Sequence, residues 1–278
     1  MKILILGSKG MLAQDMVKVF EEEELFLWDR EDLDITNKED VGIKILETRP
    51  DVVINTAAFT DVDGAEANKK IAFKVNAEAV GYLVETAKKA DAILVHFSTD
   101  YVFGQEKKEG YKETDIPKSP KSIYGESKLE GEKEILKEKN LKYYLIRLSW
   151  LFGPSFGHDY KNFVNTILRI AKEKEEIKVV DDQFGKPTYT LDLARALKNI
   201  IEKNKDFGIY HLPNETSTNW FEFAKKIVQV AGLETKIIPC KTEEFPTPAK
   251  RPKYSTLLNT KIKLQRSWQV ALEEYINN

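Results

Sequence analysis

The sequence has only one cysteine, Cys240, and only three histidines among its 278 residues. A single cysteine allows no internal disulfide, so the sequence does not fit a secreted domain held together by disulfides. His96, His158 and His211 are far apart in the chain and have no cysteine or carboxylate at the spacing of metal ligands. We therefore expect no metal site.

The sequence also lacks long apolar runs and an excess of either charge. No segment approaches the ~20 apolar residues that a membrane-spanning helix needs. The apolar run within residues 1–7 is too short for a signal peptide. With 43 basic and 45 acidic residues, the net charge of −2 provides no general attraction to nucleic acid or to an anionic membrane. We expect a cytoplasmic protein that binds neither.

Short runs rich in Val, Ile and Leu alternate with amphipathic stretches of helical length through the first half of the chain. This alternation is typical of β-α units that surround a buried parallel sheet. The pattern predicts an α/β protein with a doubly wound parallel sheet. The expected strands are residues 2–6, 25–28, 52–55, 93–97, 143–148 and 177–180.

The pattern loosens after about residue 150, where candidate strands become short and Pro246, Pro248 and Pro252 cluster. We expect a first lobe over residues 1–152, to which a return segment at about 177–205 contributes. A smaller C-terminal lobe is expected to comprise residues 153–176 and 206–278, including a short strand at 208–212. No linker-like composition separates the lobes, so they are expected to share one compact body.

A glycine-rich turn, Gly7-Ser8-Lys9-Gly10-Met11-Leu12-Ala13, directly follows the first expected strand and opens a helix. In this position Gly7 permits a tight turn, and Gly10 lets the backbone approach a pyrophosphate. The helix N-terminus then offers free N–H groups and a positive dipole end. Two glycines can also simply turn a strand into a helix. We nevertheless interpret the first lobe as a Rossmann-type NAD(P)-binding domain.

Three further segments supply candidate cofactor contacts. Asp29 and Arg30 end the second strand, where an acidic residue reads the ribose hydroxyls of NADH and an arginine accommodates the 2′-phosphate of NADPH. These neighbours leave the choice between NADPH and NADH open. Asp34 and Ile35 follow near the expected adenine position. Small residues after the third strand, within Asn55-Thr56-Ala57-Ala58-Phe59-Thr60, let the backbone pass close to the cofactor.

Tyr124 and Lys128 are four positions apart at the start of an expected helix, so they project from one face. Reduction of a ketone by hydride creates an alkoxide that needs a proton, and a free tyrosine is a poor acid at neutral pH. A neighbouring ammonium lowers the pKa of the phenol and can also hold the nicotinamide ribose. The pair therefore indicates general acid catalysis. A Tyr-x-x-x-Lys pair taken alone is often an ordinary exposed pair.

The fourth strand ends in the polar residues Ser98, Thr99 and Asp100. Ligands of open α/β sheets bind at the carboxyl ends of the strands. Thr99 is therefore expected to donate a hydrogen bond to the substrate carbonyl.

These elements, in this order, resemble the dTDP-4-dehydrorhamnose reductase family of the extended short-chain dehydrogenase/reductases. The resemblance runs almost end to end, over the segments GSKGMLA, DLDITN, RPDVVINTAAFTDVDGAE, VHFSTDYVFGQ, YGESKLEGE, IRLSWLFG, DDQFGKPTY and TPAKRPKYSTLLNT. Two positions depart from the family pattern: Ala13 replaces the third glycine, and Phe59 stands where members often carry His or Tyr.

The resemblance implies a Rossmann lobe beside a smaller nucleotide-sugar-binding lobe. It implies catalytic roles for Thr99, Tyr124 and Lys128. It implies substrate contacts at Thr99, Asp100 and Trp150, although Trp150 could instead be a core residue at the interface between the lobes. The implied cofactor contacts are Gly10, Met11, Leu12, Asp29, Asp34, Ile35, Ala58, Phe59, Thr60 and Phe97.

Three more residues are assigned from the sequence. Arg251 is expected to bind the substrate diphosphate, because a guanidinium grips phosphate oxygens through two hydrogen bonds. Asn76 is interpreted as a helix-packing residue, with support of the site through backbone or water as the alternative, and His96 is interpreted as a core residue.

The sequence thus predicts NADPH- or NADH-dependent reduction of the 4-keto group of a nucleotide-diphosphate deoxysugar, dTDP-4-dehydro-6-deoxy-L-mannose. One alternative is a nucleotide-sugar epimerase or dehydratase that retains its NAD. Another is a non-catalytic subunit that resembles the regulatory subunit of methionine adenosyltransferase. The sequence leaves a homodimer open.

Overall fold

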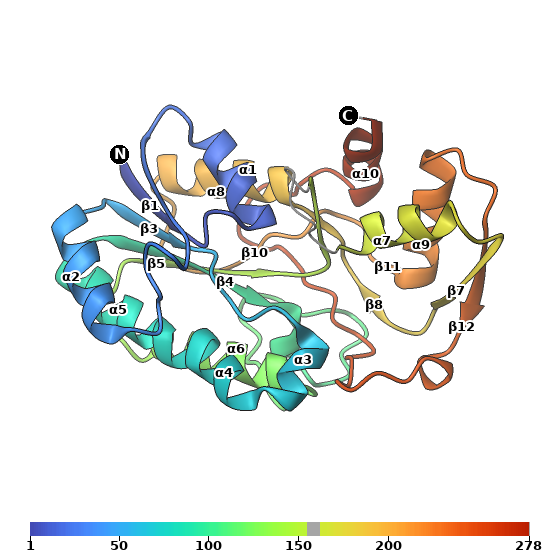
Figure 1. Ribbon diagram of the computed structural model, residues 1–278, viewed down its shortest axis with the longest axis horizontal. Coiled ribbons are helices and arrows are strands. Elements are labelled where there is room, and N and C mark those ends of the chain that lie inside the picture. Colours follow the sequence, from blue (N-terminus) through green and yellow to red (C-terminus); the bar gives the residue numbers. More distant parts are fainter. Residues whose placement is uncertain (155–161, 278) are drawn as a thin grey trace.

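A six-stranded parallel sheet forms the centre of the computed structural model, which describes residues 1–154 and 162–277 (Figure 1). His158 and part of the 153–176 segment lie outside the described residues. The strand order is β10-β5-β4-β3-β1-β2. In chain order the strands are β1 (Lys2–Leu6), β2 (Glu24–Trp28), β3 (Val52–Asn55), β4 (Ile93–Thr99), β5 (Tyr143–Leu148) and β10 (Gly208–His211). The α/β class with a doubly wound parallel sheet is confirmed.

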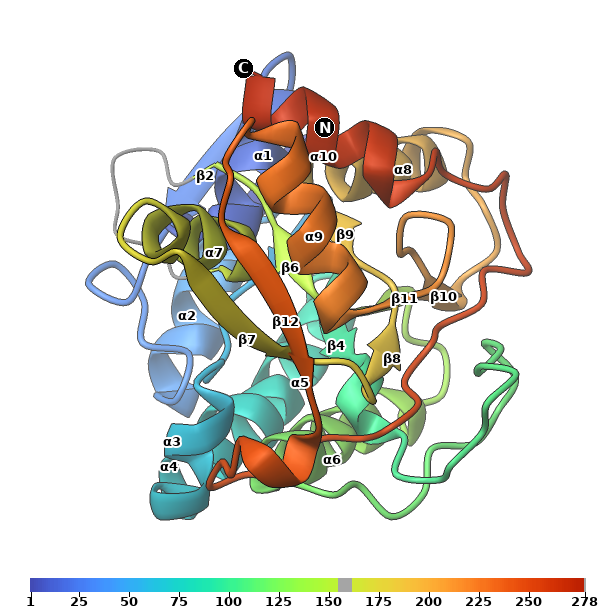
Figure 2. The same ribbon diagram turned by 90° about the vertical axis from the view of Figure 1, so that its right-hand side faces the viewer.

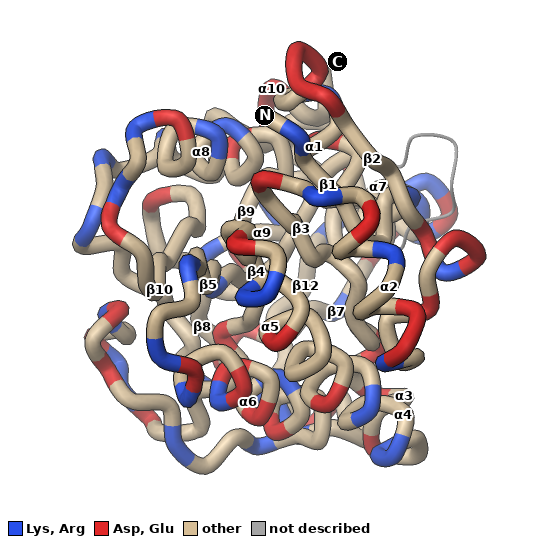
Figure 3. Tube along the Cα trace, turned by 90° about the vertical axis from the view of Figure 1, so that its left-hand side faces the viewer, with Lys and Arg blue, Asp and Glu red and all other residues tan. Residues whose placement is uncertain are grey.

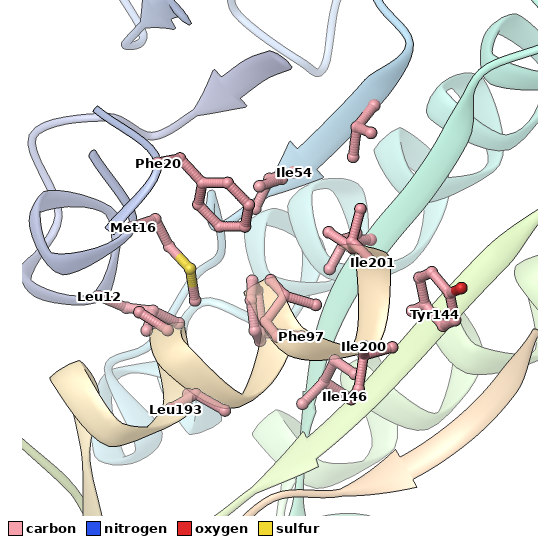
Figure 4. Packing of buried hydrophobic residues seen from close by; sticks show 14 of the residues in the cluster. Leu12, Met16, Phe20, Ile54, Phe97, Tyr144, Ile146, Leu193, Ile200 and Ile201 are labelled. Carbon is pink, nitrogen blue, oxygen red and sulfur yellow. The ribbon is translucent and has the colours of Figure 1, made fainter. Parts of the chain in front are cut away.

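Helices cover both faces of this sheet. Successive residues of a strand point to opposite faces, and in these strands the residues on both faces are mostly apolar. Ile3 and Ile5 face α1 (Met11–Val19) and α8 (Thr190–Glu202). Figure 4 shows side chains of this cluster packed between those helices and the strands. Leu4 and Leu6 belong to the opposite cluster, with α2 (Lys38–Thr48) and α5 (Ala79–Lys89).

The remaining elements on this second side connect the strands near their carboxyl ends. They are α3 (Val62–Ala67), α4 (Lys69–Phe73), the π-helix η1 (Lys74–Glu78), the short 3₁₀ helix η2 (Asp100–Val102) and α6 (Ile123–Leu136). Helix α6 contacts α3, α4, η1 and η2, so its N-terminal half lies close to the end of β4.

A third apolar cluster forms the core of the smaller lobe, whose helices and strands are seen in Figure 2. Strands β7 (Glu176–Val180) and β12 (Lys236–Cys240) pair in parallel and carry α7 (Phe163–Ala171), α9 (Trp220–Val230) and α10 (Trp268–Asn277). Four two-residue strands join the lobes: β6 (Leu151–Phe152) with β9 (Thr188–Tyr189), and β8 (Phe184–Gly185) with β11 (Thr218–Asn219). The 3₁₀ helix η3 (Thr242–Glu244) follows β12.

Two strands were assigned to the wrong sheet. Residues 177–180 were expected in the central sheet, yet β7 pairs with β12 in the smaller lobe. The strand expected at 208–212 in the smaller lobe is β10, the sixth strand of the central sheet, where it pairs with β5. The alternation in β7, with Glu176 and Lys178 exposed and Ile177 and Val179 buried, is that of a strand with one solvated face.

Lysine and arginine mingle with aspartate and glutamate over the face drawn in Figure 3. In the parts of the chain that the structure describes, no helix is long and apolar enough to cross a membrane.

Candidate functional site

A pocket of about 1370 Å³ lies at the carboxyl ends of the central strands. It exceeds the ~300–1,000 Å³ typical of a site for one small ligand, so it has room for a cofactor and a substrate together. The structure brings Arg251 and every predicted cofactor residue into its lining: Gly7, Gly10, Met11, Leu12, Asp29, Arg30, Asp34, Ile35, Ala57, Ala58, Phe59, Thr60, Phe97, Tyr124 and Lys128. Within residues 1–154 and 162–277, no group of three His, Cys, Asp or Glu side chains is arranged to hold a metal ion.

The turn after β1 has the geometry of a phosphate cradle. Gly7 has a φ of +74°, and a Cβ on it would lie 2.9 Å from the backbone nitrogen of Ala57. Only glycine fits this position. Gly10 caps α1 without any side-chain hydrogen bond, so the first N–H groups of the helix stay available to an anion. The residues present therefore fit a dinucleotide pyrophosphate.

Asp29 is held by backbone hydrogen bonds at the end of β2. Its carboxylate accepts from the N–H groups of Lys9 at 3.0 Å and of Arg30 at 2.7 Å. The Arg30 side chain is 85% exposed, and its Nε lies 3.6 Å from an oxygen of Asp34. Lys9, which also lines the pocket, was not identified from the sequence. The carboxylate that is expected to read the ribose is thus held by two backbone N–H groups, while the ammonium of Lys9 donates to Glu31 at 3.0 Å.

Asn76 supports the pocket through backbone contacts, which was the alternative to its interpretation as a helix-packing residue. Its Nδ2 donates to the carbonyl of Phe59 at 3.0 Å and to Oγ of Ser127 at 3.0 Å, and its Oδ1 accepts from the N–H of Phe59 at 2.8 Å. Asn76 therefore fixes the backbone of the pocket wall and ties it to α6. It lies in η1, and single π turns within helices are frequent at functional sites.

Tyr124 enters the pocket from the first turn of α6. Ser122 caps this helix by accepting from the N–H of Gly125 at 3.1 Å. A Cβ on Gly125 would lie 2.4 Å from the carbonyl oxygen of Tyr101, so only glycine lets the helix start so close to the end of β4. The Tyr101 and Tyr124 rings meet edge to face with centroids 5.9 Å apart.

Burial raises the pKa of Tyr124 to about 12, and the Thr99 side chain opposes this by a hydrogen bond. The expectation that Lys128 lowers the pKa of Tyr124 is wrong for the chain alone. Desolvation of the phenolate dominates, and nearby Asp100 adds to the shift. Tyr124 is therefore a protonated phenol across the physiological pH range.

Lys128 lies one helical turn beyond Tyr124 and is 2% exposed. Its Nζ donates to the carbonyl of Phe97 at 2.6 Å and lies 3.2 Å from Nε2 of His96. Burial lowers the pKa of Lys128 to about 8, against an opposing effect of Glu132. His96 is buried as expected, but its contact with Lys128 was not foreseen.

Glu132 continues the same face of α6 and anchors the helix to the sheet. Its carboxylate accepts from Arg147 Nε at 2.9 Å, from Arg147 Nη2 at 2.7 Å and from Ser98 Oγ at 2.5 Å. Both ionic side chains are 1% exposed. Because these donors occupy the carboxylate, Lys128 has no direct ion pair with it in the described structure.

Three predicted substrate residues are absent from the pocket lining that the described residues form. Thr99 and Asp100 lie just behind it, where the Thr99 hydroxyl donates to Asp100 Oδ1 at 3.0 Å. Burial raises the pKa of Asp100 to about 7. Trp150 stacks on Trp220 at a centroid distance of 3.6 Å, within the smaller lobe.

Arg251 reaches the pocket from the smaller lobe and pairs with Asp63 of α3. Its Nη1 and Nη2 donate to the two carboxylate oxygens at 2.6 and 2.7 Å. The N–H of Ala249 donates to the same carboxylate at 3.0 Å. This bidentate pair joins the two lobes across the mouth of the site.

Comparisons with known proteins cover this chain from end to end. The family model described as "RmlD substrate binding domain" matches residues 1–278. A dTDP-4-dehydrorhamnose reductase from Aggregatibacter actinomycetemcomitans is 40% identical over 98% of this chain and 97% of its own length. A solved dTDP-4-dehydrorhamnose reductase from Clostridium acetobutylicum is 41% identical with a TM-score of 0.94, covering 100% of this chain and 99% of its own. The enzyme of that name from Bacillus anthracis, solved with NADP, is 38% identical with a TM-score of 0.93. The match covers 99% of this chain and 98% of the Bacillus chain.

Proposed function

This chain belongs to the RmlD substrate-binding domain family, and from this premise we propose that it reduces the 4-keto group of a nucleotide-diphosphate deoxysugar with NADPH or NADH. The substrate that fits best is dTDP-4-dehydro-6-deoxy-L-mannose, and the product is dTDP-L-rhamnose. Relatives named dTDP-4-dehydrorhamnose reductase support this choice, because they align with nearly the whole chain at up to 41% identity.

The observation that carries the proposal is that Tyr124 and Lys128 line the same pocket as the glycine turn of α1. The reduced nicotinamide, when bound, supplies the hydride. Tyr124, which burial keeps protonated, gives its proton to the alkoxide that develops at C4. The Lys128 ammonium stabilises the phenolate that remains.

We assign to Thr99 the orientation of the substrate carbonyl. In the structure its hydroxyl donates to Asp100 and lies beside Tyr124, and on substrate binding it would exchange the bond to Asp100 for one to the carbonyl oxygen. Asp100 is fully buried, and burial raises the pKa of its carboxyl to about 7, which favours the protonated form that can donate a hydrogen bond to a sugar hydroxyl. Trp150 and Arg251 are proposed to contact the sugar and the diphosphate.

The test is to mix purified protein with the 4-keto sugar nucleotide and with NADPH or NADH. We expect one equivalent of cofactor to be oxidised for each equivalent of sugar, because a reductase releases its oxidised cofactor after every turnover. The corresponding nucleotide sugar with a 4-hydroxyl group is the control and should consume none. Turnover of the sugar without net oxidation of added cofactor would identify an epimerase or dehydratase instead. Cofactor binding without any turnover would favour a regulatory subunit.

A further inference from the structure

Asn55, His96 and Lys128 form a buried row at the wall of the pocket, one residue each from β3, β4 and α6, and Asn55 and Lys128 line the pocket while His96 lies behind them. Asn55 Nδ2 lies 3.0 Å from His96 Nδ1, and His96 Nε2 lies 3.2 Å from Lys128 Nζ. All three side chains are at most 2% exposed. Buried polar groups of this kind must match donors with acceptors.

The orientation of the Asn55 amide decides where the imidazole proton lies. Its Oδ1 accepts from the N–H of Ala57 at 3.2 Å, so its NH₂ group faces His96. An NH₂ group at this position needs the lone pair of Nδ1. The single proton of the neutral imidazole is then on Nε2, facing Lys128.

A proton on Nε2 suits only one charge state of Lys128. The neutral amine donates one N–H to the carbonyl of Phe97 and accepts from Nε2–H with its lone pair. The ammonium has no lone pair and can only donate, so Nε2 must accept from it. The ring proton must then move to Nδ1, where it faces the NH₂ group of Asn55, which is also a donor. With the neutral amine, both the Asn55–His96 contact and the His96–Lys128 contact pair one donor with one acceptor. With the ammonium, one of these two contacts brings two donors together.

The charged groups around this row do not remove the mismatch. On α6, Glu132 is occupied by Arg147 of β5 and by Ser98 of β4, and Tyr124 is neutral. Asp100, which follows β4, bonds Thr99. Burial and the charge of Lys128 hold the pKa of His96 well below its usual value, so the ring exchanges tautomers and does not become charged.

We propose that His96 is a positioning residue whose tautomer is coupled to the charge of Lys128, and that Asn55 sets the preferred tautomer. The carbonyl of Phe97 and Nε2 of His96 fix two directions of Nζ and leave the third toward the pocket. The lowered pKa of Lys128, about 8, agrees with this arrangement. The coupling between the His96 tautomer and the charge of Lys128 can be tested whether or not the protein is a reductase. The effect of this coupling on turnover rests on the proposed function.

The test is NMR of the histidine ring nitrogens in the cofactor-free protein, between pH 6 and 10. The chain has only three histidines, and His96→Gln assigns the signal. We expect a neutral ring that carries its proton on Nδ1 below about pH 8 and on Nε2 above it, following Lys128. A His96 ring that keeps one tautomer over this whole range would overturn the proposal.

Asn55→Asp provides the reciprocal test. A carboxylate accepts from Nδ1–H, so His96 should keep the Nδ1–H tautomer to a pH at least one unit higher than in the parent. The alkaline limb of kcat/KM should move upward by the same amount, while an exposed Asn199→Asp leaves both unchanged. If Asn55→Asp does not fold, His96→Gln is the replacement variant. The amide oxygen of the glutamine accepts a hydrogen bond from the Lys128 ammonium, so the alkaline limb of kcat/KM should again move to higher pH. An unshifted limb in the variants that fold would contradict the proposal.

Discussion

Lys128 shows how burial sets the working pH of a single side chain. Its ammonium is needed to stabilise the phenolate, and burial lowers its pKa to about 8, while Tyr124 stays protonated up to about 12. As the pH rises through 8, the ammonium of Lys128 loses its proton, whereas the phenol of Tyr124 keeps its own. We therefore expect kcat/KM for reduction to fall about tenfold per pH unit above that point, since this ratio reports ionisations of the free enzyme. A pH profile of initial rates checks this, and a limb first appearing near the tyrosine value would contradict it.

Arg30 is predicted to distinguish the two cofactors. Its guanidinium is 85% exposed, and its Nε lies 3.6 Å from an oxygen of Asp34, too far for a hydrogen bond, so the side chain can turn toward a 2′-phosphate. Arg30→Ala should weaken NADPH binding more than NADH binding by about 1–3 kcal/mol, the range for a charge-assisted hydrogen bond. Fluorescence titration gives both Kd values, with exposed Arg169→Ala as the control. Equal losses for the two cofactors would show that Arg30 does not read the 2′ position.

At the residue scale, the sequence predicted what local spacing determines. Tyr124 and Lys128 are one helical turn apart, and the glycine turn is a continuous segment behind a strand. The contacts made by Asn55, Asn76 and His96 depend on side chains 17 to 51 positions away in the chain, so no local pattern reveals them. The pKa of Tyr124 was misjudged for the same reason, because burial depends on the whole fold.

At the scale of elements, the Glu132–Arg147 pair fixes α6 against β5. Removing one charge of a fully buried pair leaves the other uncompensated, which costs about 3–5 kcal/mol. We expect Glu132→Gln to lower the free energy of unfolding by that amount. Glu130→Gln, which loses an exposed pair with Lys133, should cost less than about 1 kcal/mol. Urea denaturation of the two variants compares them, and similar midpoints would show that this anchor is not needed.

The strands show where sequence patterns suffice and where they do not. The runs of β1, β3 and β5 are mostly apolar, and their bounds were predicted correctly. Strands β7 and β10 are as long as β1 and β3, respectively, but neither run by itself identifies its sheet. The choice of partner depended on β12 and β5, because Glu176 of β7 pairs with Lys236 and Gly208 of β10 pairs with Tyr144, 60 and 64 positions away in the chain. The polar alternation in β7 was the one local signal that argued against a central position.

At the scale of the whole molecule, Arg251 and Asp63 join two lobes that are distant in sequence. If Arg251 binds the diphosphate, Arg251→Met should raise KM for the nucleotide sugar about tenfold or more and change kcat little, because a bidentate charge-assisted contact is lost. Exposed Lys253→Met is the matched control and should leave KM unchanged. Steady-state kinetics distinguish the two. An unaltered KM in Arg251→Met would mean that this arginine serves only the contact with Asp63.

The central claim is that Tyr124 donates the proton in reduction, and the kcat of Tyr124→Phe tests it most directly. The substitution removes one oxygen and keeps the ring, so the fold and the cofactor Kd should persist, while kcat falls about 10²- to 10⁴-fold. Lys128→Met should lower kcat and weaken cofactor binding as well, whereas Tyr82→Phe on α5 should leave both unchanged. A Tyr124→Phe enzyme whose kcat stays within about threefold of the parent would contradict the account, because general acid catalysis contributes far more than that.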